Sequence, residues 1–308
     1  MTTNPKSEDP VPTLTDSGEL YNGVSALYDK YTGDTTRRIA RFMLTLPSSP
    51  TLSQFPGSDA DSERIILDNA CGTGALTFEL LLSFPQDIKK MIEIHAIDIA
   101  PSMITTLLTK RATEYKHIHP EIRLHATPMN SQDLSFPGNS FTHIYMNFGI
   151  FFLPDPIRGI GEIYRTLKPG GHVYISTWKD LGYLDTLREA QRVIRPDSAN
   201  AREGGGVFFS QLYPEEWFTE SKLRNTLIAG GFDESRTQIL RTRTRLIGMD
   251  VDGLIETFLV PYSKRMDDAG WTVGERERLR AVIRGLLTEE QKNSASVEME
   301  AFVGVAVK

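Results

Sequence analysis

The sequence predicts an α/β protein built on a mostly parallel β-sheet. Two observations lead to this fold class. Short apolar runs alternate with segments of helical spacing between residues 65 and 178, and a glycine-rich turn follows the first apolar run. Hydrophobic residues make up 40% of the 308 residues, which is enough to fill a core. Strands that alternate with helices at this spacing form parallel sheets covered by helices on both faces.

The expected elements follow one another in a regular order. Helical spacing covers residues 20–46, and residues 47–63 have the composition of a loop. The short apolar runs predict strands at residues 65–70, 92–100, 122–128, 141–148, 172–178, 237–248 and 301–308. Helical spacing predicts helices at residues 75–84, 101–112, 156–168, 184–194 and 214–232 and over most of 250–290. Asp155 is the expected N-cap of the helix that begins at Pro156, and Pro169-Gly170-Gly171 is expected to end that helix.

These elements predict three parts of the chain. Residues 1–17 are rich in Pro, Ser, Thr and Asp and are expected to be a disordered tail. Residues 18–63 are expected to form an N-terminal helical cap and a linker. Residues 64–308 then form the main domain, with a helical lid inserted at about 181–296.

Composition excludes several classes of protein. The net charge of −6 argues against a nucleic-acid backbone as ligand, because phosphate binding needs a basic face. Cys71 is the single cysteine, so neither an intrachain disulfide nor a cysteine-based metal cluster is expected. The chain has no apolar run of membrane-spanning length and begins without an apolar signal core. We therefore expect a cytoplasmic protein with no metal and no membrane partner; its oligomeric state is not predicted.

The segment from Asp68 to Gly74 carries the chemistry. Glycines between a strand and a helix let the main chain turn tightly and approach a ligand at the helix N-terminus. Asp98 ends the next expected strand, where a carboxylate can accept both hydroxyls of a ribose. A dinucleotide site would have a third glycine where Thr77 stands, and the Asp68 carboxylate would repel a pyrophosphate. These features favour an amino-acid nucleoside as the ligand.

Four segments in this order resemble the motifs of class I S-adenosylmethionine-dependent methyltransferases. They are ILDNACGTGAL (66–76), HAIDIAPSMI (95–104), MNSQDLSFPGNSFTHIYMNFGIFFLPDP (129–156) and IYRTLKPGGHVYISTW (163–178). The first is similar to fungal small-molecule methyltransferases, including enzymes that methylate thiols of sulfur-containing metabolites. The resemblance implies a Rossmann-like fold with seven strands, the last antiparallel, and S-adenosyl-L-methionine as the cofactor.

The resemblance also implies roles for individual residues. Asp68, Gly72 and Gly74 would line the methionine part of the cofactor, and Asp98 would bind its ribose. The remaining expected contacts are Ile99 against the adenine with Met103 nearby, Asn130 and Ser131 at the adenine amino group, Asn147 and Phe148 beside the sulfonium and methyl, and Tyr28 as a cover.

The predicted function is methyl transfer to a sulfur, nitrogen or oxygen atom of a small-molecule acceptor in secondary metabolism. Many relatives have a histidine just after the fourth strand, where this chain has Phe151 and Phe152. We therefore assign no catalytic base and expect an acceptor that needs little help, such as a thiol or an amine. Two alternatives stay open: a cofactor-binding protein that does not transfer methyl groups and serves as a scaffold or in a rearrangement, and an NAD-dependent oxidoreductase.

Overall fold

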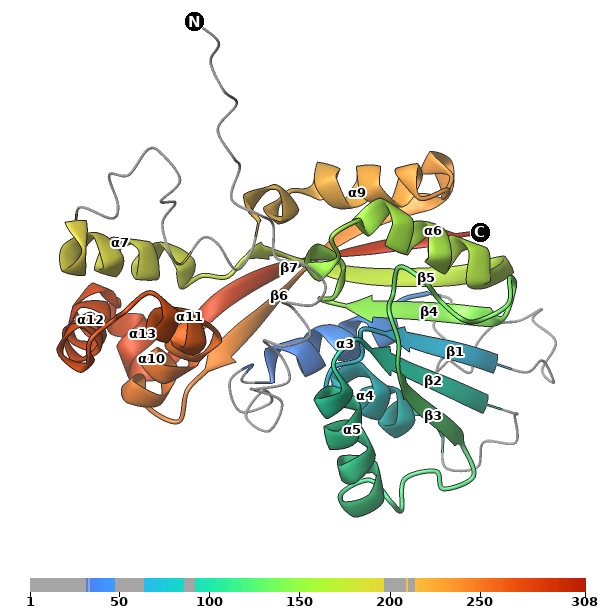
Figure 1. Cartoon of the computed structure of the whole chain (residues 1–308), viewed down its shortest axis with the longest axis horizontal. Helices are drawn as coiled ribbons and strands as arrows, with labels where there is room; N and C mark the ends of the chain where they lie inside the picture. The colour runs from blue at the N-terminus through green and yellow to red at the C-terminus, as the bar shows by residue number, and fades with distance from the viewer. Residues whose placement is uncertain (1–31, 33, 48–63, 86–91, 197–208, 210–213) are drawn as a thin grey trace, which may run out of the picture.

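The computed structural model describes residues 32, 34–47, 64–85, 92–196, 209 and 214–308. These residues form a seven-stranded sheet in the order β3-β2-β1-β4-β5-β7-β6 (Figure 1). The strands are β1 (Arg64–Asn69), β2 (Ile92–Asp98), β3 (Arg123–Pro128), β4 (Phe141–Asn147), β5 (Leu167–Asp180), β6 (Thr237–Ile247) and β7 (Ser296–Val307). The first five strands pair in parallel, and β7 is antiparallel to both β5 and β6. The predicted α/β fold is confirmed, including the antiparallel last strand.

Helices cover both faces of the sheet (Figure 1). On one face lie α3 (Thr35–Thr45), α4 (Ala75–Ser83) and α5 (Pro101–Thr113); on the other lie α6 (Pro156–Thr166) and α9 (Glu220–Ala229). The remaining helices are α7 (Leu184–Ile194), α10 (Val251–Leu259), α11 (Ser263–Asp268), α12 (Val273–Leu286) and α13 (Glu289–Ser294), and the 3-10 turns are η1 (Ile150–Phe152), η3 (Glu215–Phe218), η4 (Glu234–Arg236) and η5 (Val260–Tyr262).

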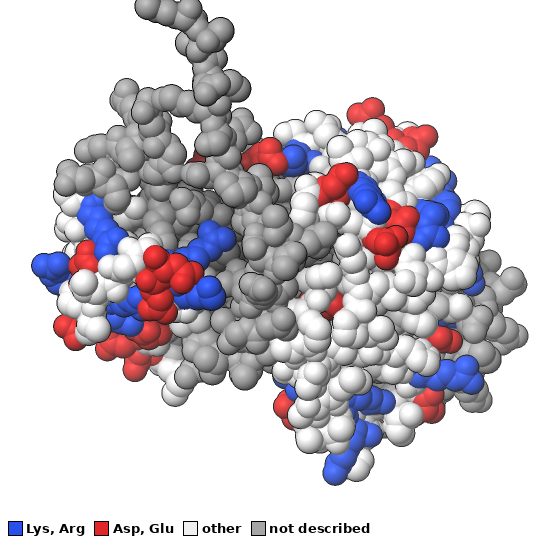
Figure 2. All heavy atoms as spheres, viewed as in Figure 1, with Lys and Arg blue, Asp and Glu red and all other residues white. Residues whose placement is uncertain are grey.

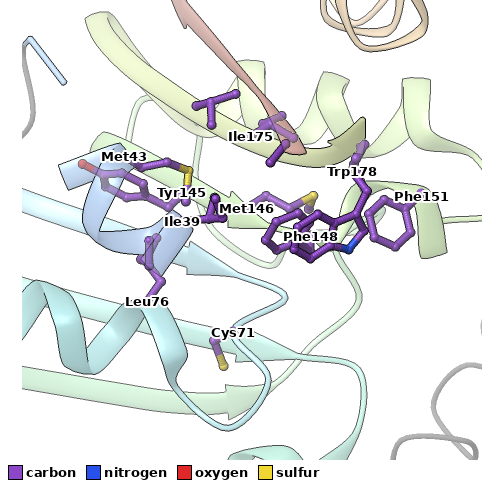
Figure 3. Close-up of a cluster of buried hydrophobic side chains, with 14 of the residues drawn as sticks. Ile39, Met43, Cys71, Leu76, Tyr145, Met146, Phe148, Phe151, Ile175 and Trp178 are labelled. Carbon is purple, nitrogen blue, oxygen red and sulfur yellow. The ribbon is translucent and has the colours of Figure 1, made fainter. Parts of the chain in front are cut away.

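The central strands and α3 share one apolar core. Tyr145 of β4 is fully buried, and Ile39 and Met43 of α3 pack over it with Leu76 of α4 (Figure 3). Strands covered on both faces carry nearly continuous apolar residues, which explains why β1 and β4 show no polar alternation. This packing sets the carboxyl ends of β1, β2 and β4 along one edge of the sheet.

Two strands begin earlier than the sequence predicts. The helix expected over 156–168 ends at Thr166, and β5 starts at Leu167, which pairs with Phe141. The Pro-Gly-Gly segment therefore lies inside β5, with Gly170 at φ 78°, and does not follow a helix. The final strand starts at Ser296, not at residue 301, and its residues 296–299 pair with β6 alone.

The segment expected to be a helical lid differs in the structure. Its middle part is β6, which pairs with β7 over its whole length, and α9, which packs on these two strands. The helices outside the sheet are α7 and α10 to α13, which gather beyond the ends of β6 and β7 (Figure 1). The strand expected at 237–248 is thus β6, at the edge of the sheet. Its own residues do not indicate which strand it pairs with.

The expected tail, 1–17, lies outside the described residues, as does most of the expected cap; of residues 18–63, only 32 and 34–47 are described. None of the described helices is both long and apolar enough to cross a membrane.

Candidate functional site

The glycine turn connects β1 to α4 at the centre of the sheet. Ala70, Gly72 and Gly74 all have positive φ, at 59°, 54° and 94°, and the N–H of Cys71 donates to the carbonyl of Ile97 at 2.8 Å. The two glycines differ in surroundings. A Cβ on Gly72 would meet open space, whereas one on Gly74 would lie 2.6 Å from the ring of Phe78. The open space at Gly72 is where a ligand can approach the main chain.

Asp68 ends β1 as a fully buried carboxylate. Its Oδ2 accepts a hydrogen bond from Thr77 Oγ1 at 2.5 Å, while Oδ1 has no partner among the described residues. Burial raises the pKa of Asp68 to about 7, although the bond from Thr77 opposes this shift. A buried carboxylate oxygen without a donor is costly, so the site suits a cationic or hydrogen-bonding ligand group.

Asp98 ends β2 and ties two backbone segments together. Its Oδ2 accepts from the N–H of Gly72 at 2.9 Å, and its Oδ1 accepts from the N–H of Ala100 at 2.9 Å. Burial raises the pKa of this carboxyl, and its hydrogen bonds with backbone N–H groups partly offset the rise. Each oxygen keeps a second acceptor position. Ile99 beside it is 36% exposed, an apolar side chain left open at the strand end.

The loop after β3 crosses the ends of β2 and β1. Met129 donates its N–H to the carbonyl of Asp98, and Ser131 Oγ donates to Asn69 Oδ1 at 2.6 Å. Asn130 Oδ1 accepts from the N–H of Gln132, which leaves its amide NH2 as a donor. The loop is therefore held to the edge of the sheet beside the glycine turn.

The end of β4 carries Asn147 and Phe148. Phe148 has φ 59° and is buried, and its ring stacks on Trp178 of β5 with centroids 3.9 Å apart (Figure 3). A Cβ on Gly149 would come within 2.6 Å of the Cβ of Ala70, so this segment abuts the glycine turn. The segments that directly follow β4 and β1 are therefore in close contact.

Most of the expected site residues meet at this edge. Because the strands are parallel, the carboxyl ends of β1 to β4 lie together, and they bring Asp68, Gly72, Gly74, Asp98, Ile99, Asn130, Ser131, Asn147 and Phe148 into one region. Met103 lies in α5, directly after β2, with its side chain 2% exposed. Tyr28 lies outside the described residues.

Three residues that shape the site were not among those expected from the sequence. Thr77, Asn69 and Ser176 each hydrogen-bond an expected site residue. Thr77 had a detectable signal, since it stands in the first turn of the helix that follows the glycines. Ser176 had none, because it reaches Asn147 only through the register of β4 and β5.

Comparison with known proteins agrees with this geometry. Residues 67–175 match the model of a family described as a methyltransferase domain. The chain is 25% identical over 224 residues to the methyltransferase tpcH of Aspergillus fumigatus, covering 72% of this chain and 75% of that protein. It is 29% identical over 275 residues to acetylaranotin bis-thiomethyltransferase of Aspergillus terreus, covering 86% and 89%.

Solved structures share the fold. The cyclase SpnF superposes with a TM-score of 0.55 at 16% identity, covering 98% of this chain and 99% of that one. A phosphoethanolamine N-methyltransferase 2 of Haemonchus contortus superposes with a TM-score of 0.54 at 15% identity, covering 98% and 60%. With the glycine turn and the two acidic strand ends in place, residues 67–175 form a methyltransferase domain that uses S-adenosylmethionine as its cofactor.

Proposed function

We propose that this enzyme transfers a methyl group to a heteroatom of a small-molecule acceptor, with sulfur as the first candidate. The observation that carries the cofactor site is the buried Oδ1 of Asp68, which no described residue hydrogen-bonds, beside a glycine turn that Asp98 holds in place. A site of this kind suits the ammonium group and the ribose of an amino-acid nucleoside.

The residues at the strand ends fit S-adenosylmethionine part by part. Asp68 would face the ammonium group, directly or through water, and the space over Gly72 would admit the methionine chain. Asp98 would bind the ribose hydroxyls through the acceptor positions that its backbone donors leave open. The adenine would lie between Ile99 and Asn130.

The other expected residues complete this assignment. Met103 would back the adenine from α5, and Ser131 would fix the loop beside it through Asn69. Gly74 would act through packing, because its position against Phe78 has no room for a ligand. Tyr28 is proposed as a cover from the N-terminal segment.

Catalysis requires alignment more than proton transfer. When bound, the cofactor supplies an activated methyl group on a sulfonium. The chain would hold that group beside Phe148 and Trp178, whose rings exclude water and attract a positive charge. In-line approach of the acceptor is then the main contribution of the protein. The helices beyond β6 and β7, together with α3, are proposed to enclose the acceptor.

The position of the histidines favours a thiol. The six histidines are at 95, 117, 119, 125, 143 and 172, and none belongs to the carboxyl ends of β4 and β5. A thiol ionises in part near neutral pH and needs less help than an alcohol. The likeness to a bis-thiomethyltransferase supports the same choice. The new bond would join the acceptor sulfur to the methyl carbon as the bond from that carbon to the cofactor sulfur breaks, S-adenosylhomocysteine would leave as a neutral thioether, and the thiol proton would pass to solvent.

Two measurements test the proposal. Calorimetry should show S-adenosylmethionine binding. Asp98→Ala should weaken this binding by about tenfold or more, because the variant loses the contacts with both ribose hydroxyls and the hydrogen bond from the Gly72 N–H. Asp133→Ala removes an exposed carboxylate of the neighbouring loop and serves as the matched control.

The second measurement is formation of S-adenosylhomocysteine with a panel of thiols, amines and alcohols. A thiol should give the highest rate. Binding without turnover of any acceptor would favour a protein that holds the cofactor without transferring methyl. Binding of NAD in place of S-adenosylmethionine would contradict the proposal and restore the oxidoreductase alternative.

A further inference from the structure

Asn147 stands at the end of β4, and the protein itself uses both ends of its amide. Its Nδ2 donates to the carbonyl of Thr36 in the first turn of α3 at 3.1 Å. Its Oδ1 accepts from Ser176 Oγ of β5 at 2.7 Å. The amide therefore links α3 to β5 across the end of β4 and is not oriented by a ligand.

Ser176 extends this link to Phe148. The same hydroxyl that donates to Asn147 accepts the backbone N–H of Phe148 at 3.0 Å. Phe148 has φ 59°, a conformation that costs a bulky residue free energy and persists only where its surroundings hold it. Ser176 supplies that restraint, and the stack of Phe148 on Trp178, at an interplanar angle of 17°, fixes the ring.

The other end of the link is also fixed. Glu79 of α4, whose side chain is 6% exposed, binds Arg41 of α3 through both carboxylate oxygens at 2.6 and 2.9 Å. Arg37 adds a contact to the same carboxylate at 2.6 Å. Two-point arginine–carboxylate contacts define orientation as well as distance. The start of α3 is thus a firm support for Thr36 and hence for Asn147.

We propose, on the basis of the S-adenosylmethionine site proposed above at Asp68, Gly72 and Asp98 (the donor site), that Asn147 is a positioning residue. It acts through Ser176 to hold Phe148 toward the sulfonium. It is not a direct polar ligand of the cofactor. Gly149, the next residue, packs on Ala70 of the glycine turn, so Phe148 lies beside the place where the donor group must sit. An aromatic face held there attracts a sulfonium cation more strongly than the neutral thioether.

This role predicts a specific pattern of ligand affinity. S-Adenosylmethionine and S-adenosylhomocysteine differ only in the charged methyl-bearing sulfur, so the change in the ratio of their Kd values between variant and wild type reports how the variant alters recognition of the sulfonium. We expect Ser176→Ala and Asn147→Ala to reduce the preference for S-adenosylmethionine by about three- to tenfold. The Kd of S-adenosylhomocysteine should stay within about twofold of the wild type, since the groups that hold its adenosine and amino-acid parts are unchanged.

Neighbouring variants provide controls. Thr177→Val removes a buried hydroxyl of the same strand that has no hydrogen-bond partner among the described residues, and it should leave the ratio unchanged. Ser176→Thr keeps the hydroxyl and should restore the preference. Hydrogen exchange should also quicken at the Phe148 amide in Ser176→Ala and at the first turn of α3 in Asn147→Ala.

The outcomes separate the two proposals. Equal weakening of both ligands by Asn147→Ala would show direct contact with the shared part of the ligand and overturn the positioning role, as would an unchanged ratio in both variants. Should Asn147→Ala fail to fold, Ser176→Ala alone decides, because it leaves the α3 contact intact. A wild-type protein that binds neither ligand would instead overturn the proposed donor site.

Discussion

Asp68 shows how one buried side chain can serve binding at the expense of stability. It is fully buried and receives one hydrogen bond on one oxygen, while the other oxygen has no partner among the described residues. A carboxylate in such a place is stabilised far less than it would be in water. Its rise in pKa therefore measures free energy that the folded protein gives up and that a cationic ligand can return.

The stability of the free protein should depend on pH through Asp68. Burial raises its pKa from 3.8 to about 7, so between these values the folded state holds one proton more than the unfolded state. The free energy of unfolding therefore falls as pH rises through this window. Asp68→Asn removes the charge, keeps an acceptor for Thr77, and should raise the free energy of unfolding at pH 8 by on the order of 2 kcal/mol.

Thermal unfolding at pH 5 and pH 8 checks this expectation. The stabilisation should be larger at pH 8 than at pH 5, because pH 5 lies in the lower part of the window between 3.8 and about 7, and the variant should lose S-adenosylmethionine binding. Equal unfolding temperatures of variant and wild type at pH 8 would contradict the burial of an ionised carboxylate.

The affinity for S-adenosylmethionine should also depend on the protonation of Asp68, but it should rise with pH where the stability of the free protein falls. An ammonium group beside Asp68 favours the ionised carboxylate and lowers the pKa, which is about 7 in the free protein. Affinity should therefore rise with pH between about 5.5 and 7.5, below the range in which an α-amino group loses its proton. Calorimetry in buffers of different ionisation enthalpy should detect a proton released on binding; a constant affinity over this range would exclude Asp68 as the partner.

At the scale of elements, the two glycines in the turn between β1 and α4 have different surroundings. Gly72 faces open space and is tied to Asp98, whereas Gly74 packs against Phe78 and Leu107. The ring of Phe78 is itself stacked on Tyr115 with centroids 4.0 Å apart, so it has little room to move. We therefore expect the first glycine to admit the ligand, and the second lets α4 and α5 pack closely.

Alanine at each glycine should separate these tasks. Gly74→Ala should lower the free energy of unfolding by about 3 kcal/mol, since a left-handed alanine and a steric clash both cost free energy. Gly72→Ala should cost only about 1–2 kcal/mol in stability. Its methyl group, however, enters the open space and should weaken S-adenosylmethionine binding by about tenfold or more.

The unfolding temperature and the Kd for S-adenosylmethionine should be measured for Gly72→Ala, Gly74→Ala and the wild type. Gly138→Ala, a glycine of negative φ on a surface turn, is the matched control. Normal ligand binding by Gly72→Ala would place the ligand elsewhere.

At the scale of the whole molecule, β6 and β7 join two regions. Residues 300–307 of β7 also pair with β5, whereas residues 296–299 of β7 and their partners 244–247 of β6 extend beyond β5 toward the helices α7 and α10 to α13. On the visible face of these helices, acidic and basic side chains are interspersed and form no continuous basic strip among the described residues (Figure 2). The buried side chains of these helices belong to the same apolar cluster as those of the sheet, and Tyr183, just before α7, stacks on Phe258 of α10.

Arg195 holds this helical region together. Its guanidinium binds Glu275 at 2.7 and 2.9 Å and lies over the ring of Trp271 at 4.5 Å. Arg195→Ala should loosen α7 from α12 without affecting the donor site, because its partners lie in α12 and in the residues just before it. Hydrogen exchange should quicken in α7 and α12, methyl transfer should fall, and the Kd of S-adenosylmethionine should stay unchanged.

Arg195→Lys retains the charge but not the two-point contact and should give a partial effect. A large loss of S-adenosylmethionine affinity in Arg195→Ala would show instead that these helices belong to the donor site.

The sequence predicted the elements near the donor site closely because their signals are local. The apolar run of β1, the glycine turn and the acidic end of β2 each depend on neighbouring residues. The strand at 237–248 was also predicted, but its place in the sheet was not, because it depends on pairing with β7, about fifty to seventy residues later in the chain. Asn147 was placed beside the sulfonium, but its contact with Thr36, 111 positions away, had no local signal.

The sequence by itself determined the class of the protein: alternating strands and helices, a glycine turn at the first strand end and carboxylates at two strand ends specify a nucleoside-binding sheet. Only the tertiary structure decided which partner each polar atom has. Asp68 keeps one oxygen without a partner among the described residues, Asp98 binds backbone N–H groups through both oxygens, and the Asn147 amide is held from both ends by the protein itself. The reason is that periodicity encodes burial and local hydrogen bonds, whereas the partner of a polar side chain is set once distant strands are in register.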